Sequence, residues 1–179
     1  IGTSHNLWID NNGYAFIEHS WGDAINIADL SNPLQPIQVG SFGFLGENTH
    51  DIFTRDGIAY VSNGWSENFL ICDISNINNI EVISTIEDGI TGYAHNAWPT
   101  DNNDYLVTTE ETENKTVKIW DIQDLSNINL VGEYLAENGL AHNVHVKESL
   151  IYISHYTTGL RIIDIYDPTY PVEVAGWDT

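Results

Sequence analysis

Four histidines are placed at nearly equal intervals along the chain. They are His5, His50, His95 and His142, separated by 45, 45 and 47 residues, and each is followed by Asn or Asp. Neutral imidazole is a ligand for zinc, copper, iron and nickel. Buried imidazole also makes structural hydrogen bonds. The spacing is therefore compatible with a ring of histidines around a divalent transition metal, with hydrogen bonds repeated between structural units, or with direct contact to a ligand.

A second set of residues lies at or just past the end of the run predicted to be the second strand of each repeat. Its members are acidic, imidazole and indole side chains that differ between repeats: Glu18, His19, Trp21, Trp65, Glu110, Glu111 and His155. Exposed aromatic rings beside carboxylates are typical of loops that bind a ligand or a partner. We expect this set to form a ligand or partner face, although the two tryptophans would equally serve to cap their own repeats. If a metal is bound, Glu18 or Glu110 is the expected partner that orients a histidine ligand.

The sequence around each histidine repeats as well. Four short runs rich in Val, Ile, Tyr, Trp and Phe follow one another, separated by turn residues, as expected of four strands. In the first repeat these runs are HNLWID, YAFIE, INIADL and IQVGSF. The first two are joined by Asn11-Asn12-Gly13, and their counterparts in the second repeat by Asp56-Gly57, residue types that tolerate the positive φ of a tight hairpin. No stretch has the apolar period of a helix.

Repeats of this kind, with four strands in about 40–50 residues, are the mark of a β-propeller. The sequence predicts an all-β protein of four tandem four-stranded antiparallel blades, at approximately 1–49, 50–94, 95–141 and 142–179. We expect the chain to be an excerpt of a six- to eight-bladed ring, with closure as four blades as the alternative. In such a ring the start of the first strand and the end of the second strand of each blade share one face. The histidines and the second set would therefore meet there.

Strand alternation favours a structural role for the four histidines. The residues two and four positions after each histidine should lie on its side of the strand. They are mostly apolar: Leu7 and Ile9, Ile52 and Thr54, Ala97 and Pro99, Val144 and Val146. We therefore expect the histidines to be largely buried and hydrogen-bonded within or between blades, with the metal ring and ligand contact as alternatives.

Each run predicted as a third strand ends in an aspartate: Asp29, Asp73, Asp121 and Asp164. An aspartate in this position accepts hydrogen bonds from the backbone of the following turn, which explains the repetition without a carboxylate site. The only cysteine, Cys72, lies in one of these apolar runs, and we expect it to be buried and inert.

The charge balance excludes some partners. There are 26 acidic residues against 5 basic ones, giving a net charge of −21 at pH 7. Such a surface repels phosphate backbones, so we expect no nucleic-acid partner. No apolar run is long enough to span a bilayer, so we expect no direct membrane insertion. The acidity suits a cationic partner, or serves only to keep the protein soluble.

The repeated HN and HD starts, together with GLRIIDIYDPTYPVEVAG and INIADLSNPLQPIQVGSF, resemble the LVIVD-repeat propellers. The chain is more closely similar to the choice-of-anchor B family through THD at 49–51, YAHNAW at 93–98 and AHNVHVK at 141–147. The resemblance covers the whole chain. It implies an exported bacterial protein, extracellular or at the cell surface, with further blades on either side, and it implies no particular reaction.

These observations favour a non-catalytic, exported or surface-displayed binding module. Its His-, Asp- and Glu-rich face would take a protein, glycan or small-molecule ligand. The alternative is a metalloenzyme with a histidine-ringed metal on the propeller axis, and a third reading is a scaffold domain. The sequence contains no Gly-rich phosphate loop, nucleophile elbow, HExxH or CxxC motif.

Overall fold

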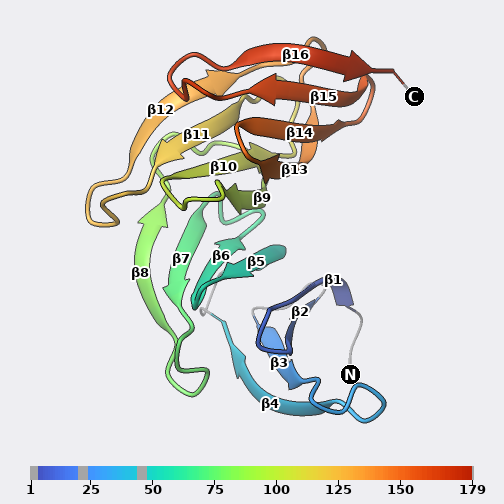
Figure 1. The fold of residues 1–179 in the computed structure, drawn as a ribbon, viewed down its shortest axis with the longest axis vertical. Helices are drawn as coiled ribbons and strands as arrows, with labels where there is room; N and C mark the ends of the chain where they lie inside the picture. Colours follow the sequence, from blue (N-terminus) through green and yellow to red (C-terminus); the bar gives the residue numbers. More distant parts are fainter. Residues whose placement is uncertain (1–3, 20–23, 44–47, 179) are drawn as a thin grey trace. The chain divides into compact units, whose positions relative to one another are not determined.

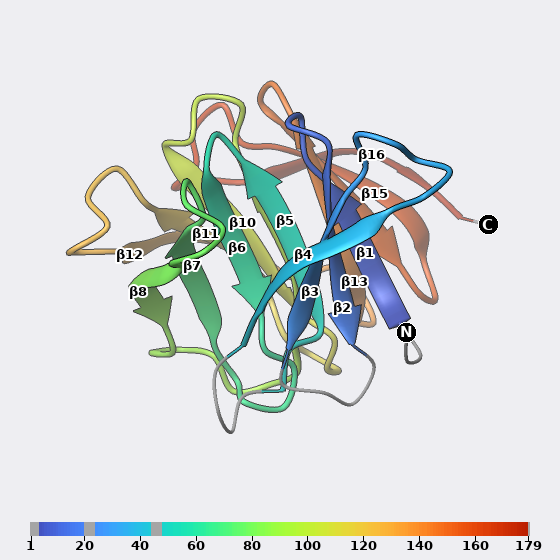
Figure 2. The ribbon, with the colours of Figure 1, turned by 90° about the horizontal axis from the view of Figure 1, so that it is seen from below.

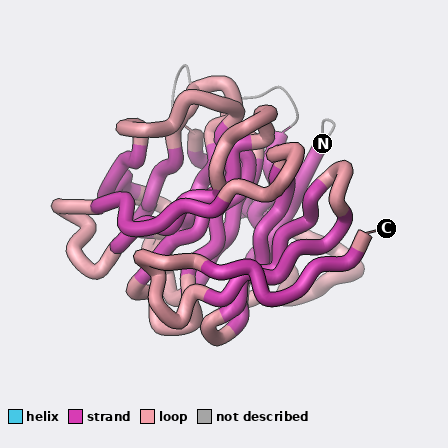
Figure 3. The backbone as a smooth tube through the Cα atoms, turned by 90° about the horizontal axis from the view of Figure 1, so that it is seen from above, coloured by secondary structure: helices cyan, strands magenta, loops and turns pink. Residues whose placement is uncertain are grey.

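The computed structural model describes residues 4–19, 24–43 and 48–178, except for the side chain of His19. Its sixteen strands form four separate sheets of four strands each, and the described residues contain no helix (Figures 1 and 3). In every sheet the strands lie in chain order, each antiparallel to the next. The predicted all-β class and the four antiparallel sheets are confirmed. The described part of the chain also lacks a helix of the length and apolarity that crossing a membrane requires.

The chain divides into two compact units, Ile1–Glu87 and Asp88–Thr179. The first unit holds two sheets (Figure 2). One sheet consists of β1 (Ser4–Ile9), β2 (Tyr14–His19), β3 (Ile25–Asp29) and β4 (Ile37–Phe42). The other consists of β5 (Asp51–Arg55), β6 (Ile58–Ser62), β7 (Phe69–Asp73) and β8 (Glu81–Ile86). The core of this unit lies between the two sheets and includes Phe16, Ile27, Ile52 and Val61.

The second unit is built in the same way. Its first sheet consists of β9 (Ala94–Pro99), β10 (Tyr105–Glu110), β11 (Val117–Asp121) and β12 (Asn129–Tyr134). Its second sheet consists of β13 (Ala141–Lys147), β14 (Leu150–His155), β15 (Gly159–Asp164) and β16 (Val172–Trp177). β9 and β13 therefore begin one residue before the blade starts predicted at residues 95 and 142.

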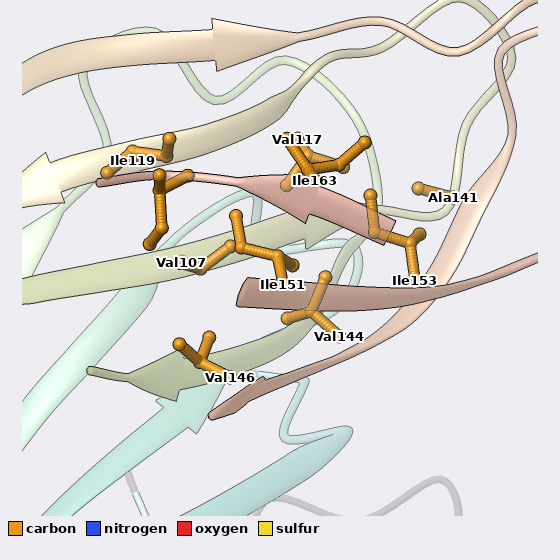
Figure 4. Packing of buried hydrophobic residues seen from close by; sticks show 10 residues of the cluster. Val107, Val117, Ile119, Ala141, Val144, Val146, Ile151, Ile153 and Ile163 are labelled. Atoms are coloured by element: carbon orange, nitrogen blue, oxygen red, sulfur yellow. The ribbon is translucent and has the colours of Figure 1, made fainter. Parts of the chain in front are cut away.

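Aliphatic side chains from the two sheets of the second unit interlock to form its core (Figure 4). Ile151, Ile153 and Ile163 are fully buried there. Burial of each such side chain stabilises the fold by about 1.5–3 kcal/mol. Successive side chains of a strand point to opposite faces of its sheet, so each sheet presents one apolar face to the other. This packing holds the first strands of the two sheets, β9 and β13, against each other.

The turns follow the chemistry read from the sequence. Gly13, Asp56 and Gly57 all have positive φ, at 84°, 51° and 80°, in the hairpins between the first and second strands. The aspartates that end the third strands accept a backbone N–H from the following turn in all four sheets: Asp29 from Ser31, Asp73 from Ser75, Asp121 from Gln123 and Asp164 from Tyr166. The turn role predicted for these aspartates is confirmed, and hydrogen bonds from Ser75 hold the pKa of Asp73 below its ordinary value.

Candidate functional site

A β-bulge lies at three of the four histidines, His5, His95 and His142, near the start of their strands. In the first sheet Ser4 pairs with His19 but Leu7 pairs with Ile17, so three steps along β1 face two along β2. The same shift occurs in the pairing of β9 with β10 and of β13 with β14. An extra residue of this kind interrupts side-chain alternation, and bulges often redirect a side chain next to a functional site. The side-chain alternation expected from the histidines is therefore interrupted in these blades.

In the second unit two of the histidines meet a glutamate. Nε2 of His95 lies 3.4 Å from Oε2 of Glu111, and Nε2 of His142 lies 3.9 Å from Oε1 of the same carboxylate. The two imidazole rings are 4.2 Å apart between centroids and tilted by 43°. The hydroxyl of Tyr156 donates a hydrogen bond to Glu111, and its ring packs edge-on against His142 at 5.1 Å. Two imidazoles, a carboxylate and a phenol thus form one cluster.

Equivalent backbone positions hold the carboxylate and the phenol of this cluster. Glu111 directly follows β10, and its N–H donates to the carbonyl of Tyr93, two residues before His95. Tyr156 directly follows β14, and its N–H donates to the carbonyl of Leu140, two residues before His142. The end of each second strand is therefore tied to the loop that presents the histidine. The bond from Tyr156 to Glu111 raises the pKa of Tyr156 to about 12, so the phenol remains a donor at neutral pH.

Connections between neighbouring first strands come from the residue after the histidine. Oδ1 of Asn96 accepts the backbone N–H of Val144 at 2.9 Å in the second unit. In the first unit the side-chain amide of Asn6 donates to Asp51. These contacts are of the kind predicted for the histidines themselves, and they give a role to three of the four Asn or Asp residues that follow the histidines.

The four histidines differ in exposure. His95 is only 3% exposed, whereas the side chain of His142 is 37% exposed, His50 is partly buried and His5 is exposed. The prediction of burial is confirmed for His95 and wrong for His5. The bulge alone does not account for the difference, because buried His95 and exposed His5 both lie at one.

Three members of the second set are buried, and they brace loops. A carboxylate oxygen of Glu18 accepts the backbone N–H groups of His5 and Asn6 at 3.2 and 3.3 Å. Glu110 accepts the N–H of Thr91 at 2.9 Å and forms a buried ion pair with Lys118. Neither carboxylate is the exposed group expected from the sequence. Both instead satisfy loop N–H groups that would otherwise be orphaned.

His155 is the third buried member. Its Nε2 accepts the N–H of Leu140 at 3.0 Å, so the ring proton sits on Nδ1, 2.9 Å from the hydroxyl of Thr158. Burial, reinforced by the positive charge of Arg161, lowers the pKa of His155. The imidazole is therefore a neutral structural group rather than the exposed contact residue expected from the sequence.

Two members of the second set are accessible. Trp65 is exposed in the first unit, and the side chain of Glu111 is 26% exposed in the second. His19 ends β2, but its side chain is not among the groups described, and Trp21 lies outside the described residues. Cys72 is fully buried, and burial raises the pKa of its thiol to about 12, as expected of an inert cysteine.

A pocket of about 330 Å³ opens beside the cluster in the second unit. It is lined by His142, Ser154, His155, Tyr156, Gly159 and Leu160. Tyr156 is 55% exposed and Leu160 37% exposed, so the pocket presents apolar surface to solvent. Sequence reasoning did not select either residue. The signal available for Tyr156 was its place directly after His155, which matches that of Glu111 after Glu110.

Comparison with known proteins identifies the repeat and the fold. A family model for the LVIVD repeat matches residues 1–43 and 138–179. No curated protein matches the chain. Among solved structures, the periplasmic gluconolactonase of Pseudomonas aeruginosa is similar with a TM-score of 0.81 at 10% identity, over 99% of this chain and 55% of that chain. A putative 6-phosphogluconolactonase from Bacteroides fragilis has a TM-score of 0.79 at 12% identity, over 96% of this chain and 53% of that chain.

A computationally designed protein, Ika4, is also similar, with a TM-score of 0.69 at 13% identity over 92% of each chain. At these identities the similarities establish the β-propeller fold alone. The chain spans about half the length of the two lactonases.

Proposed function

We propose that this LVIVD-repeat β-propeller protein is a non-catalytic binding module that takes a small ligand in the pocket of its second unit. The observation that carries the proposal is the lining of that pocket. Exposed Tyr156 and Leu160 supply apolar contact area, and Ser154 and His142 supply a few polar groups. This combination is typical of small-molecule sites, and the volume lies at the lower end of their range of about 300–1,000 Å³.

The charge of the chain narrows the class of ligand. With a net charge of −21, the protein disfavours the approach of anions and favours neutral or cationic molecules. Glu111 places a carboxylate next to His142 and Tyr156 at the edge of the pocket, which adds a local attraction for cations. A protein or glycan partner would use the same exposed tyrosine.

The engagement of the nearby titratable groups supports binding rather than catalysis. His155 uses both ring nitrogens in hydrogen bonds within the fold, and Glu110 is paired with Lys118. Nε2 of His155 has to give up its bond to the N–H of Leu140 before it can take a proton from a ligand. The alternative, a metalloenzyme, is supported by one observation, the cluster of His95, Glu111 and His142.

An extracytoplasmic location is part of the proposal. It is supported by the LVIVD repeats and by the periplasmic origin of the gluconolactonase with a similar fold. The resemblance of the sequence to the choice-of-anchor B family also favours export.

A library of small neutral and cationic fragments, screened by ligand-observed NMR against the full chain, tests the pocket. We expect several fragments to bind and to lose binding in Leu160→Lys, because the lysine replaces apolar contact area with a solvated charge. Leu34→Lys is the matched control, since Leu34 is 91% exposed and lies in the first unit. The proposal fails if no fragment binds, or if Leu160→Lys binds the same fragments as the wild type.

A further inference from the structure

We propose that His95, Glu111 and His142 bind a divalent transition metal ion, and that zinc is the ion this ligand set favours. Among the side chains that the structure describes, these are the only three His, Cys, Asp or Glu residues whose potential ligand atoms all lie within 4.8 Å of one another. The proposal concerns a binding site. It does not require a reaction.

The distances within the cluster are close to those of a coordination sphere. Ligand atoms at about 2.0–2.2 Å from a tetrahedral zinc ion lie about 3.3–3.6 Å from one another. The separation of His95 Nε2 and Glu111 Oε2, 3.4 Å, already falls in that range. His142 Nε2 lies 3.9 Å from the other oxygen of that carboxylate, Oε1, which is slightly longer than the range. Because the side chain of His142 is 37% exposed, a small movement of its ring would complete the set without repacking the core.

The donor types also fit. Two imidazole nitrogens and one carboxylate oxygen are a common protein ligand set for zinc, with the fourth position left to water or another ligand. Non-haem iron(II) uses a similar set, so the two ions are distinguished by measurement rather than by donor type. The acidic chain attracts any cation, but among the described side chains this cluster alone brings two nitrogen donors and a carboxylate together.

Neighbouring groups hold the ligands in place, as is usual for metal sites. The hydroxyl of Tyr156 donates to the carboxylate of Glu111 and thereby fixes its orientation. The hydroxyl of Thr109 donates to the backbone carbonyl of His142 at 2.6 Å, which anchors the strand that carries this ligand. Burial of His95, together with the two anchored neighbours, indicates a site that is organised before an ion arrives.

The fourth position of the ion would lie on the exposed side of the cluster, next to the pocket lined by His142 and Tyr156. A small molecule in that pocket could then donate an atom to the metal. This extension rests on the proposed function, whereas metal binding itself does not.

Calorimetric titration of zinc into the chelator-treated full chain, carrying no histidine tag, tests the site, and cobalt(II) absorption reports its geometry. We expect one high-affinity site per chain and a visible cobalt spectrum typical of four-coordination. Glu111→Gln and His142→Ala should each weaken zinc binding at least 100-fold. Tyr156→Phe should weaken it by about 10-fold, because it removes only the orienting hydrogen bond.

His145→Ala is the matched control, since His145 lies on the same strand as His142 but stacks on Trp98 at 4.1 Å. It should bind zinc as the wild type does. The proposal is overturned if no high-affinity site is found, if Glu111→Gln binds zinc unchanged, or if His145→Ala or His5→Ala loses as much affinity as His142→Ala. Fragment binding at Leu160 is measured without zinc, so either proposal can fail while the other stands.

Discussion

His5 and His50 in the first unit have ring centroids 4.7 Å apart, and His95 and His142 in the second unit have ring centroids 4.2 Å apart. Both pairs come from neighbouring first strands, and in both units the residue after the earlier histidine is hydrogen-bonded to the other strand. Among the described side chains, only the second pair is joined by a carboxylate, that of Glu111. The repeat supplies the histidine pair, and a residue that differs between repeats decides what the pair can do.

The two units differ again beneath the histidines. Lys118, in the third strand of the sheet that carries His95, is buried and paired with the buried carboxylate of Glu110. The corresponding residue in the sheet that carries His5 is Asn26, which is hydrogen-bonded to Gln38 near the surface. A buried ammonium requires a charged partner, whereas a partly exposed amide does not. The second unit therefore depends on a charge pair that has no counterpart at Asn26.

Removal of that charge should have the largest effect. Lys118→Met leaves the carboxylate of Glu110 buried without its cation, which should cost about 3–5 kcal/mol of the free energy of unfolding. A loss of this size lowers Tm by roughly 6–20 °C in a chain of this length. Asn26→Met is the control and should change stability by less than about 0.5 kcal/mol. Thermal denaturation followed by circular dichroism measures both, and equal Tm values would remove this difference between the units.

Removal of a buried histidine should destabilise the fold more than removal of an exposed one. His95→Ala removes a buried imidazole that faces Glu111, and it should cost about 1–3 kcal/mol. His5→Ala removes an exposed ring and should cost less than about 0.5 kcal/mol. Urea denaturation of the two variants measures the difference. Similar losses for both would show that the two pairs have the same structural role.

The smallest expected effect is on pH dependence. The pKa of His155 is lowered in the folded state, so the fold favours the neutral ring. Its contribution is fully present above the unfolded pKa of about 6.5 and decreases as the pH falls below that value, by at most about 1.4 kcal/mol per pH unit. The corresponding residue of the first unit, Asn63, does not titrate. Denaturation at pH 7.5 and 5.5 should show a smaller loss on acidification in His155→Gln than in the wild type, while His145→Gln should match the wild type.

Most of the fold could be predicted from the sequence because each blade repeats the same order of strands, hairpins and turn aspartates. Gly13 and Asp29, for example, were assigned to their turns from residue type alone. The face carrying the histidines was also expected. The orientations of its side chains were not expected, because strict alternation of apolar and polar residues does not reveal where a strand contains a bulge. The register shift lies between Thr109 and Glu110. Glu110 points inward and pairs with Lys118, whereas the next residue, Glu111, lies beside the histidines.

The bulge also has an evolutionary meaning. When a blade is duplicated, the residues after the bulge, such as Ala97 and Val144, must keep packing against the neighbouring sheet. The residues just past the end of the second strand, opposite the bulge, are released from that register and can change without a penalty in the core, as Glu111 and Tyr156 do. A chain built in this way can give each copy of the repeat a different recognition residue while the architecture is inherited intact. Divergence between blades is therefore expected to concentrate just past the end of the second strand.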